Sequence, residues 1–101
     1  MKYLNQVFNI NKKNIVLTGA NGLVGKKVAS NLRKLGANMI LIDYDPTKKN
    51  TYSLKKNKKE YFFNLDISNE KEVKKACSQL KKDNIKLDVL INAHQTNIKG
   101  F

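Results

Sequence analysis

The stretch Thr18-Gly19-Ala20-Asn21-Gly22-Leu23-Val24-Gly25 follows an apolar run, Asn14-Ile15-Val16-Leu17, and opens an amphipathic segment. The order is therefore strand, glycine-rich turn and helix. Three glycines at a spacing of three allow a tight backbone turn to approach a pyrophosphate at a helix N-terminus. The stretch predicts a dinucleotide-binding turn in which amides near Leu23 and Val24 face the pyrophosphate.

Apolar runs elsewhere in the chain alternate with helical patterns. They predict parallel strands over residues 14–19, 38–43, 60–66 and 87–92. Alternation of strands and helices with right-handed crossovers is typical of an α/β protein. The predicted fold is a Rossmann-type doubly wound parallel sheet with strand order 3-2-1-4, and its ligand crevice opens at the carboxyl ends of strands 1 and 4.

Two helices are expected between these strands. Apolar residues recur at helical spacing over 22–35, and Gly36 suits a left-handed cap at the end of that helix. Ser68 is expected to cap the second helix. Residues 46–59 are rich in lysine and predict a short helix at best, with exposed loop around it.

Length and composition restrict the class of protein. A chain of 101 residues holds one domain at most. Its single cysteine, Cys77, makes a reducing cytoplasm the default location. No run approaches the roughly 20 apolar residues of a membrane span, and the N-terminus lacks the pattern of a secretory signal. We expect no membrane partner.

The net charge of +12 raises nucleic-acid binding as an alternative. The basic residues are nearly all lysines, spread over both helices, the middle loop and the tail, and Arg33 is the one arginine. This distribution favours a solvated surface over a polyanion site. We expect no nucleic-acid partner, and a salt titration of DNA binding would distinguish the two interpretations.

An acidic residue ends the second predicted strand. Asp43 follows the glycine turn at about the 20-residue spacing expected for a carboxylate that binds an adenosine ribose. A carboxylate accepts hydrogen bonds from the 2′-hydroxyl and repels a 2′-phosphate, and Tyr44 offers no counter-charge. The pair favours NAD over NADP. The alternative is that Asp43 merely starts the turn before Asp45 and Pro46.

Four motifs in this order resemble the N-terminal part of a short-chain dehydrogenase/reductase. They are Thr18 to Gly25, Asp43, Asn64-Leu65-Asp66-Ile67 and Leu87-Asp88-Val89-Leu90-Ile91-Asn92-Ala93. The resemblance covers the chain from about Phe8 onward. The glycine spacing is typical of the extended branch, the nucleotide-sugar epimerases and dehydratases, whereas the last motif resembles the shorter dehydrogenase branch.

The resemblance implies roles for further residues. Asp66 and Ile67 would contact the adenine, although Asp66 has the alternative role of capping the turn that follows its strand. Asn92 would tie the fourth strand to its neighbour and line the ribose pocket. The cofactor-binding residues expected from the turn, from Asp43 and from the resemblance together are Gly19, Asn21, Gly22, Leu23, Val24, Gly25, Asp43, Tyr44, Asp66, Ile67, Asn92 and Ala93.

The family's catalysis requires a serine and a Tyr-x-x-x-Lys pair, in which the lysine lowers the pKa of the tyrosine. Tyr44 with Lys48 and Tyr52 with Lys56 match the spacing, but they fall between the second and third strands, on the adenosine side. The resemblance therefore places the catalytic residues beyond Phe101. It implies that residues 1–101 are the NAD(P)-binding part of a longer protein and that the sheet is incomplete at its C-terminal side.

We therefore expect an NAD-dependent oxidoreductase that transfers hydride on an alcohol or carbonyl substrate, with a link to sugars or glycans. The alternatives are a nucleotide-sugar epimerase or dehydratase and a non-catalytic NAD-binding module. The complete protein is expected to be a homo-oligomer, and the 101 residues alone are expected to be inactive and poorly soluble or oligomeric. His94 stands where the family has a small residue. No cluster of ligands accompanies it, so no metal site is expected.

Overall fold

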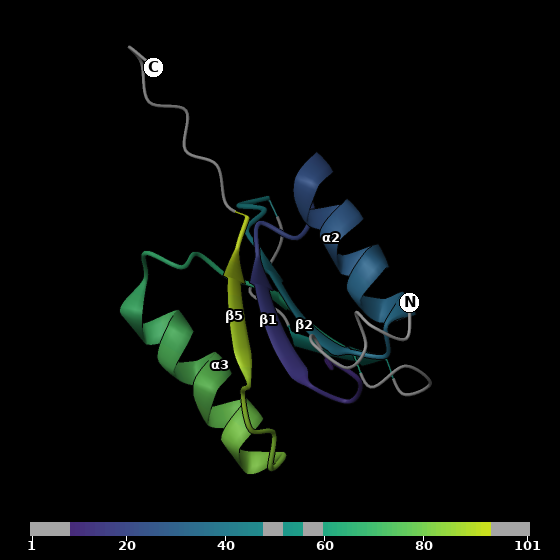
Figure 1. The fold of residues 1–101 in the computed structure, drawn as a ribbon. Helices are drawn as coiled ribbons and strands as arrows, with labels where there is room; N and C mark the ends of the chain where they lie inside the picture. The colour runs from purple at the N-terminus through teal and green to yellow at the C-terminus, as the bar shows by residue number, and fades with distance from the viewer. Residues whose placement is uncertain (1–8, 48–51, 56–59, 94–101) are drawn as a thin grey trace.

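A sheet with one helix on each face forms the body of the chain in the computed structural model (Figure 1). The structure describes residues 9–47, 52–55 and 60–93. The strands are β1 (Asn14–Thr18), β2 (Asn38–Asp43), β3 (Tyr52–Lys55), β4 (Glu60–Asn64) and β5 (Val89–Asn92). The helices are α2 (Leu23–Lys34) and α3 (Glu70–Lys82).

The strand order in the sheet is β3-β4-β2-β1-β5. The pairs β4–β2, β2–β1 and β1–β5 are parallel. These four strands are those expected from the sequence, so the predicted parallel order 3-2-1-4 and the doubly wound Rossmann-type fold are confirmed. Because the order reverses at β1, the carboxyl ends of β1 and β5 flank the switch point of the sheet.

The expectation of a short helix within residues 46–59 is wrong. Tyr52–Lys55 form β3, which pairs antiparallel with β4 in the register Tyr52↔Phe63 to Lys55↔Glu60. The sequence Tyr-Ser-Leu-Lys alternates apolar and polar residues, a period-2 signal that four residues make weak. The open edge of β4 supplies the partner that makes this segment a strand.

Helix α2 ends at Lys34, and Gly36 follows it as the predicted left-handed cap. This glycine has a φ of 90°, in the left-handed region that favours glycine. Its amide donates to Arg33 O at 2.9 Å, and the amide of Ala37 donates to Leu32 O at 3.1 Å. This pair of bonds is the Schellman motif, which satisfies carbonyls at the end of the helix.

Helix α3 begins one residue later than the sequence predicted, because Asn69 and not Ser68 is its N-cap. Asn69 Oδ1 accepts from two backbone amides of the first turn, at 3.1 and 3.3 Å. Ser68 instead donates its hydroxyl to Asp66 Oδ1 at 2.7 Å. Either residue type caps a helix well, so the choice depends on which side chain the preceding turn already uses.

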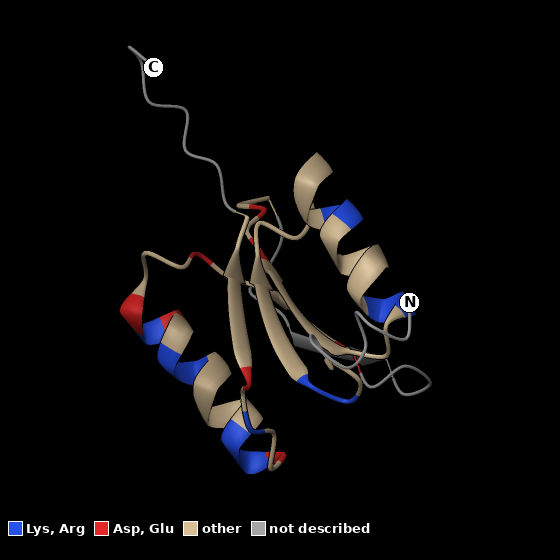
Figure 2. Ribbon diagram, in the orientation of Figure 1, with Lys and Arg blue, Asp and Glu red and all other residues tan. Residues whose placement is uncertain are grey.

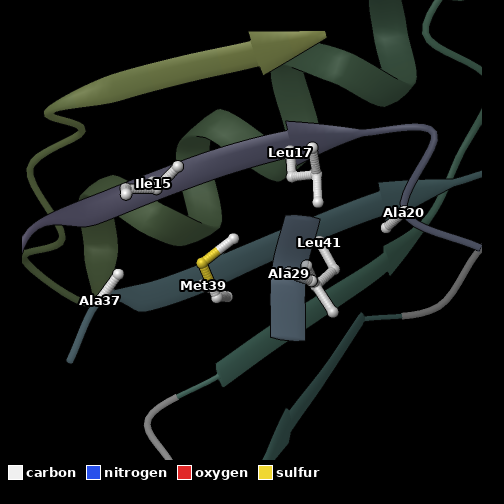
Figure 3. Close-up of a cluster of buried hydrophobic side chains, with 7 residues drawn as sticks. All are labelled: Ile15, Leu17, Ala20, Ala29, Ala37, Met39 and Leu41. Carbon is white, nitrogen blue, oxygen red and sulfur yellow. The ribbon is translucent and has the colours of Figure 1, made fainter. Parts of the chain in front are cut away.

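Alternation along the strands divides the core into two clusters, one on each face of the sheet. The cluster under α2 contains Ile15, Leu17, Ala20, Ala29, Ala37, Met39 and Leu41 (Figure 3). The cluster under α3 contains Val16, Ile40, Tyr61, Phe63, Leu65, Ala76 and Leu80. A central strand buried on both faces requires the continuous apolar runs seen in the sequence.

Candidate functional site

The glycine-rich turn joins the carboxyl end of β1 to the N-terminus of α2. Gly19 has a φ of 72°, and its carbonyl accepts from the amide of Gly22 at 3.2 Å. Gly22 is the N-cap and has no side chain to cap the helix, and the first turn of α2 holds no acidic residue. The amides at the start of a helix lack intrahelical partners. The positive end of α2 is therefore open to an anion.

Side chains on the first turn leave this helix end accessible. Leu23 is 93% exposed and Val24 is 53% exposed. Large apolar side chains at such exposure gain little from the protein's own core. Their position beside the open amides is the one that the sequence predicted for the pyrophosphate contact.

Two of the glycines meet different constraints. A Cβ at Gly25 would lie 2.1 Å from Gly19 O and 2.9 Å from Gly19 C, so only glycine lets α2 pack this closely on the turn. A Cβ at Gly22 would lie 3.5 Å from Gly19 O, an ordinary contact. The protein's own packing therefore does not require glycine at position 22, whereas close approach of a ligand to the backbone would.

Asp43 lies at the end of β2, beside the turn. Its Oδ2 accepts from the amide of Asn21 at 2.6 Å, and its Oδ1 accepts from the amide of Tyr44 at 2.7 Å. The amide of Ala20 also donates to Ile42 O at 3.2 Å. These bonds fix the carboxylate next to the glycine turn, while the Tyr44 side chain is 47% exposed. The structure thus brings together Asp43 and the turn, which are far apart in sequence.

Asp66 and Ile67 follow β4 at the same edge of the sheet. The amide of Leu65 donates to Asp43 O at 3.0 Å, which places the two strand ends side by side. Asp66 Oδ1 accepts from the amide and the hydroxyl of Ser68, at 2.9 and 2.7 Å. The turn-capping role considered for Asp66 is therefore present. Ile67 is 42% exposed at this edge.

Asn92 is tied to the neighbouring strand, as the family resemblance implied. Thr18 Oγ1 donates to Asn92 Oδ1 at 2.7 Å, and the amide of Ala93 donates to Thr18 O at 3.0 Å. Thr18 is 8% exposed. The ends of β1 and β5 are held together at the switch point.

The sequence analysis assigned no supporting role to Asn64 or Glu72, although both hold this edge of the sheet. Asn64, 5% exposed, holds the segment after β2 by accepting from the amide of Asp45 at 2.8 Å. Glu72 Oε2 accepts from the amide of Asp66 at 2.7 Å. The available signals were an asparagine at a strand end and a glutamate three residues after Asn69, the spacing of a capping box.

Four kinds of sequence prediction concern residues away from the glycine turn: the Tyr-x-x-x-Lys matches, His94, a metal site and a membrane span. Tyr44 follows β2 and Tyr52 begins the edge strand β3, so both fall between β2 and β4 in the sequence, as expected. Lys48, Lys56 and His94 fall in the parts of the chain that the structure does not describe. Among the described residues there is no group of histidine, cysteine and acidic side chains that could hold a metal ion. Neither described helix is long and apolar enough to cross a membrane.

Basic side chains are distributed around the fold. Figure 2 shows them on α2, on α3 on the opposite face of the sheet, and on connecting loops. Phosphate backbones are bound by basic residues gathered on one face. Within the described residues, the arrangement follows the dispersed pattern read from the sequence.

Three comparisons with known proteins agree with this geometry. A family model described as short chain dehydrogenase matches residues 13–97. The NAD-dependent glycerol dehydrogenase of Listeria innocua serovar 6a is 29% identical over 86 residues, which are 85% of this chain and 34% of that protein. The 3-hydroxyacyl-CoA dehydrogenase type-2 of Drosophila melanogaster is 34% identical over 86 residues, 85% of this chain and 33% of that protein.

A solved structure is similar in both fold and sequence. The short chain dehydrogenase from Leptospira borgpetersenii serovar Hardjo-bovis, with bound NAD+, has a TM-score of 0.70 and 27% identity. The match covers 88% of this chain and 34% of that one. The chain thus spans about one third of the length of the relatives that it matches.

Proposed function

Because the chain belongs to the short-chain dehydrogenase family, we propose that it binds NAD at the glycine turn and serves as the cofactor-binding part of an NAD-dependent oxidoreductase. The NAD+ bound in the Leptospira structure and the NAD dependence of the Listeria relative support this choice of cofactor. The assignment extends to residues 1–101 as one NAD-binding region of a longer protein.

The observation that carries the proposal is the placement of Asp43 against the turn. Its carboxylate oxygen lies 2.6 Å from the Asn21 amide, next to the open N-terminus of α2. A dinucleotide requires an anion site and a ribose acceptor at this separation along the chain and this proximity in space. Gly22 leaves room for the pyrophosphate, and Asp43 accepts from the ribose hydroxyls.

The remaining site residues would orient the cofactor. Ile67 offers an apolar surface for the adenine, and Asp66 would accept from its exocyclic amine. The Thr18–Asn92 hydrogen bond holds the carboxyl ends of β1 and β5 together beneath the proposed cofactor site. When bound, NAD supplies the hydride chemistry, and the chain supplies binding and orientation. The proton-transfer residues that the family uses are proposed to lie beyond Phe101.

We propose an alcohol or carbonyl compound as the substrate, and sugar-linked compounds are the first to test. We also propose that the complete protein is a homo-oligomer located in a reducing cytoplasm. The glycine spacing favours a second candidate, a nucleotide-sugar epimerase or dehydratase that uses NAD transiently. Conversion of a nucleotide sugar with no net change in NADH would favour that candidate. NAD binding without turnover by the longer protein would favour a non-catalytic module.

The direct test is calorimetric titration of the purified protein with NAD+ and NADP+. We expect NAD+ to bind more tightly, and Asp43→Asn to weaken NAD+ binding about tenfold, because hydrogen bonds to a charged group contribute roughly 1.5–3 kcal/mol. Asp88→Asn is the matched control. It makes the same charge change at the amino end of the sheet, where Asp88 Oδ2 accepts from the Asn14 amide at 2.8 Å. Equal loss in both variants would contradict the proposed role of Asp43.

A further inference from the structure

The glycine turn contains two neighbouring residues that can react with each other. Asn21 precedes Gly22, and of the 14 asparagines in the chain it is the only one that glycine follows. The side-chain amide carbon of an asparagine is an electrophile within reach of the next backbone nitrogen, and attack closes a succinimide ring. A side chain on the following residue hinders that attack, whereas glycine has no Cβ to do so. Asn21 is therefore the asparagine whose sequence context favours the reaction most.

The structure leaves the two reacting groups accessible. Asn21 and Gly22 are both exposed. The Gly22 amide donates to Gly19 O at 3.2 Å, which is at the long end of the range for such bonds. Gly22 is the N-cap of α2, where the amide takes no part in the hydrogen-bond ladder of the helix. The attacking nitrogen is thus held by a long bond, and the positive end of α2 stabilises the negative charge that it develops.

We propose that Asn21 is a site of spontaneous deamidation. The Gly22 nitrogen forms a bond to Asn21 Cγ, the Cγ–Nδ2 bond breaks, and Nδ2 leaves as ammonia with the proton of the Gly22 amide. Water then opens the ring at either carbonyl carbon. Cleavage of the new C–N bond gives aspartate, and cleavage of the original peptide bond gives isoaspartate. No atom changes its oxidation state, so water is the one co-reactant.

The consequence concerns the cofactor site, and this part of the inference rests on the proposed function. The Asn21 amide donates to Asp43 Oδ2 at 2.6 Å, so residue 21 is fixed beside the carboxylate proposed to bind the ribose. An aspartate there adds a second negative charge next to the open end of α2, where it repels the phosphates of the cofactor. An isoaspartate also lengthens the backbone before Gly22 by a methylene group. Deamidation therefore lowers the affinity for NAD as the protein ages.

Incubation of the purified protein at mildly alkaline pH, followed by peptide mapping with mass spectrometry, tests the site itself. We expect the side-chain NH2 to be replaced by OH at least severalfold faster at Asn21 than at Asn84, which is also exposed but precedes Ile85. Equal rates at the two asparagines would overturn the proposal.

Gly22→Ala is the matched variant for the reaction. Its Cβ would make an ordinary contact with Gly19 O at 3.5 Å, so the turn is kept while the methyl group hinders the attack. The rate at Asn21 should fall towards that at Asn84, and an unchanged rate would overturn the mechanism. Saturating NAD+ should also slow the reaction in the wild type, because it stabilises the closed turn.

Calorimetry with NAD+ tests the consequence. We expect Asn21→Asp, which carries the aspartate product, to raise the Kd about tenfold. Asn84→Asp makes the same charge change after α3, at the amino end of the sheet, and should bind as the wild type does. Equal affinity of Asn21→Asp and the wild type would overturn the effect on the cofactor.

The two proposals fail in distinguishable ways. A wild type that deamidates at Asn21 but binds no NAD+ would overturn the proposed function and leave the modification site standing. A wild type that binds NAD+ but is not modified at Asn21 would overturn the modification site and leave the proposed function standing.

Discussion

Replacing Gly25 with alanine tests whether the third glycine is required by packing. The added Cβ would lie 2.1 Å from Gly19 O, so α2 must withdraw by about 1.3 Å to reach the 3.4 Å of ordinary contact. Overpacking costs roughly 1–3 kcal/mol, and a contact with backbone atoms, which cannot move aside like a flexible side chain, places this variant at about 2–3 kcal/mol. The higher helix propensity of alanine returns about 1 kcal/mol of that cost. We expect Gly25→Ala to lower the free energy of unfolding by about 1–2 kcal/mol, or the Tm by roughly 5–10 °C.

Gly22→Ala is the matched control, with the opposite balance of effects. Its Cβ would make an ordinary contact at 3.5 Å, and the φ of −72° suits alanine. Stability should therefore fall by less than about 1 kcal/mol, as for a changed N-cap. NAD+ affinity should fall about tenfold or more, because the methyl group occupies the space in which the pyrophosphate approaches the backbone.

Urea unfolding followed by circular dichroism measures the stability of both variants, and calorimetry measures their NAD+ affinity. The reasoning is refuted if Gly25→Ala is as stable as the wild type, since the backbone would then accommodate the methyl group without cost. It is refuted equally if Gly22→Ala binds NAD+ as tightly as the wild type. Loss of binding in Gly22→Ala at unchanged stability would separate the ligand's requirement from the fold's.

Further substitutions test three contacts of the fold. Asn69→Ala should lower the free energy of unfolding by about 1 kcal/mol because it removes the N-cap of α3, and Ser68→Ala should lower it by less. If urea unfolding gives the larger loss for Ser68→Ala, Ser68 would be the N-cap instead. Thr18→Val should lower the free energy of unfolding by about 1 kcal/mol because it removes the hydrogen bond to Asn92 of β5. Hydrogen exchange should then show faster opening of β5, and unchanged exchange would contradict a stabilising role for the bond. Arg33→Gln removes the ion pair between α2 and Glu60, whose side chain is only 5% exposed. Thermal unfolding should show a free energy of unfolding lower by about 1–3 kcal/mol. A double-mutant cycle with Glu60→Gln should show coupling between the two side chains, and its absence would contradict the pairing.

The hybrid character of the motifs bears on the choice between branches of the family. The glycine spacing resembles that of the extended branch, whereas the end of β5 resembles that of the shorter branch. In the structure both features meet at one place, because Thr18 at the start of the turn binds Asn92 at the end of β5. A substrate screen of the proposed longer protein should therefore include simple alcohols beside nucleotide sugars.

The parts of the candidate site could be located from the sequence because each part is a local pattern. A glycine turn and a carboxylate about 20 residues later predict an anion site and a ribose acceptor by their spacing alone. The dual use of Asp66 was not decided by sequence, because an aspartate after a strand suits a turn and a ligand equally well. The structure shows the turn contact to Ser68, while the adenine contact remains a prediction.

The sequence by itself determined the glycine turn, the Gly36 cap, the four parallel strands and their order, because backbone sterics and apolar periodicity act over a few residues and crossovers have one hand. The tertiary structure alone decided that Tyr52–Lys55 is a strand, that Asn69 caps α3, and that Asp43 binds the Asn21 amide. These features depend on which edges and side chains meet across the fold, and a short segment of sequence does not contain its distant partner.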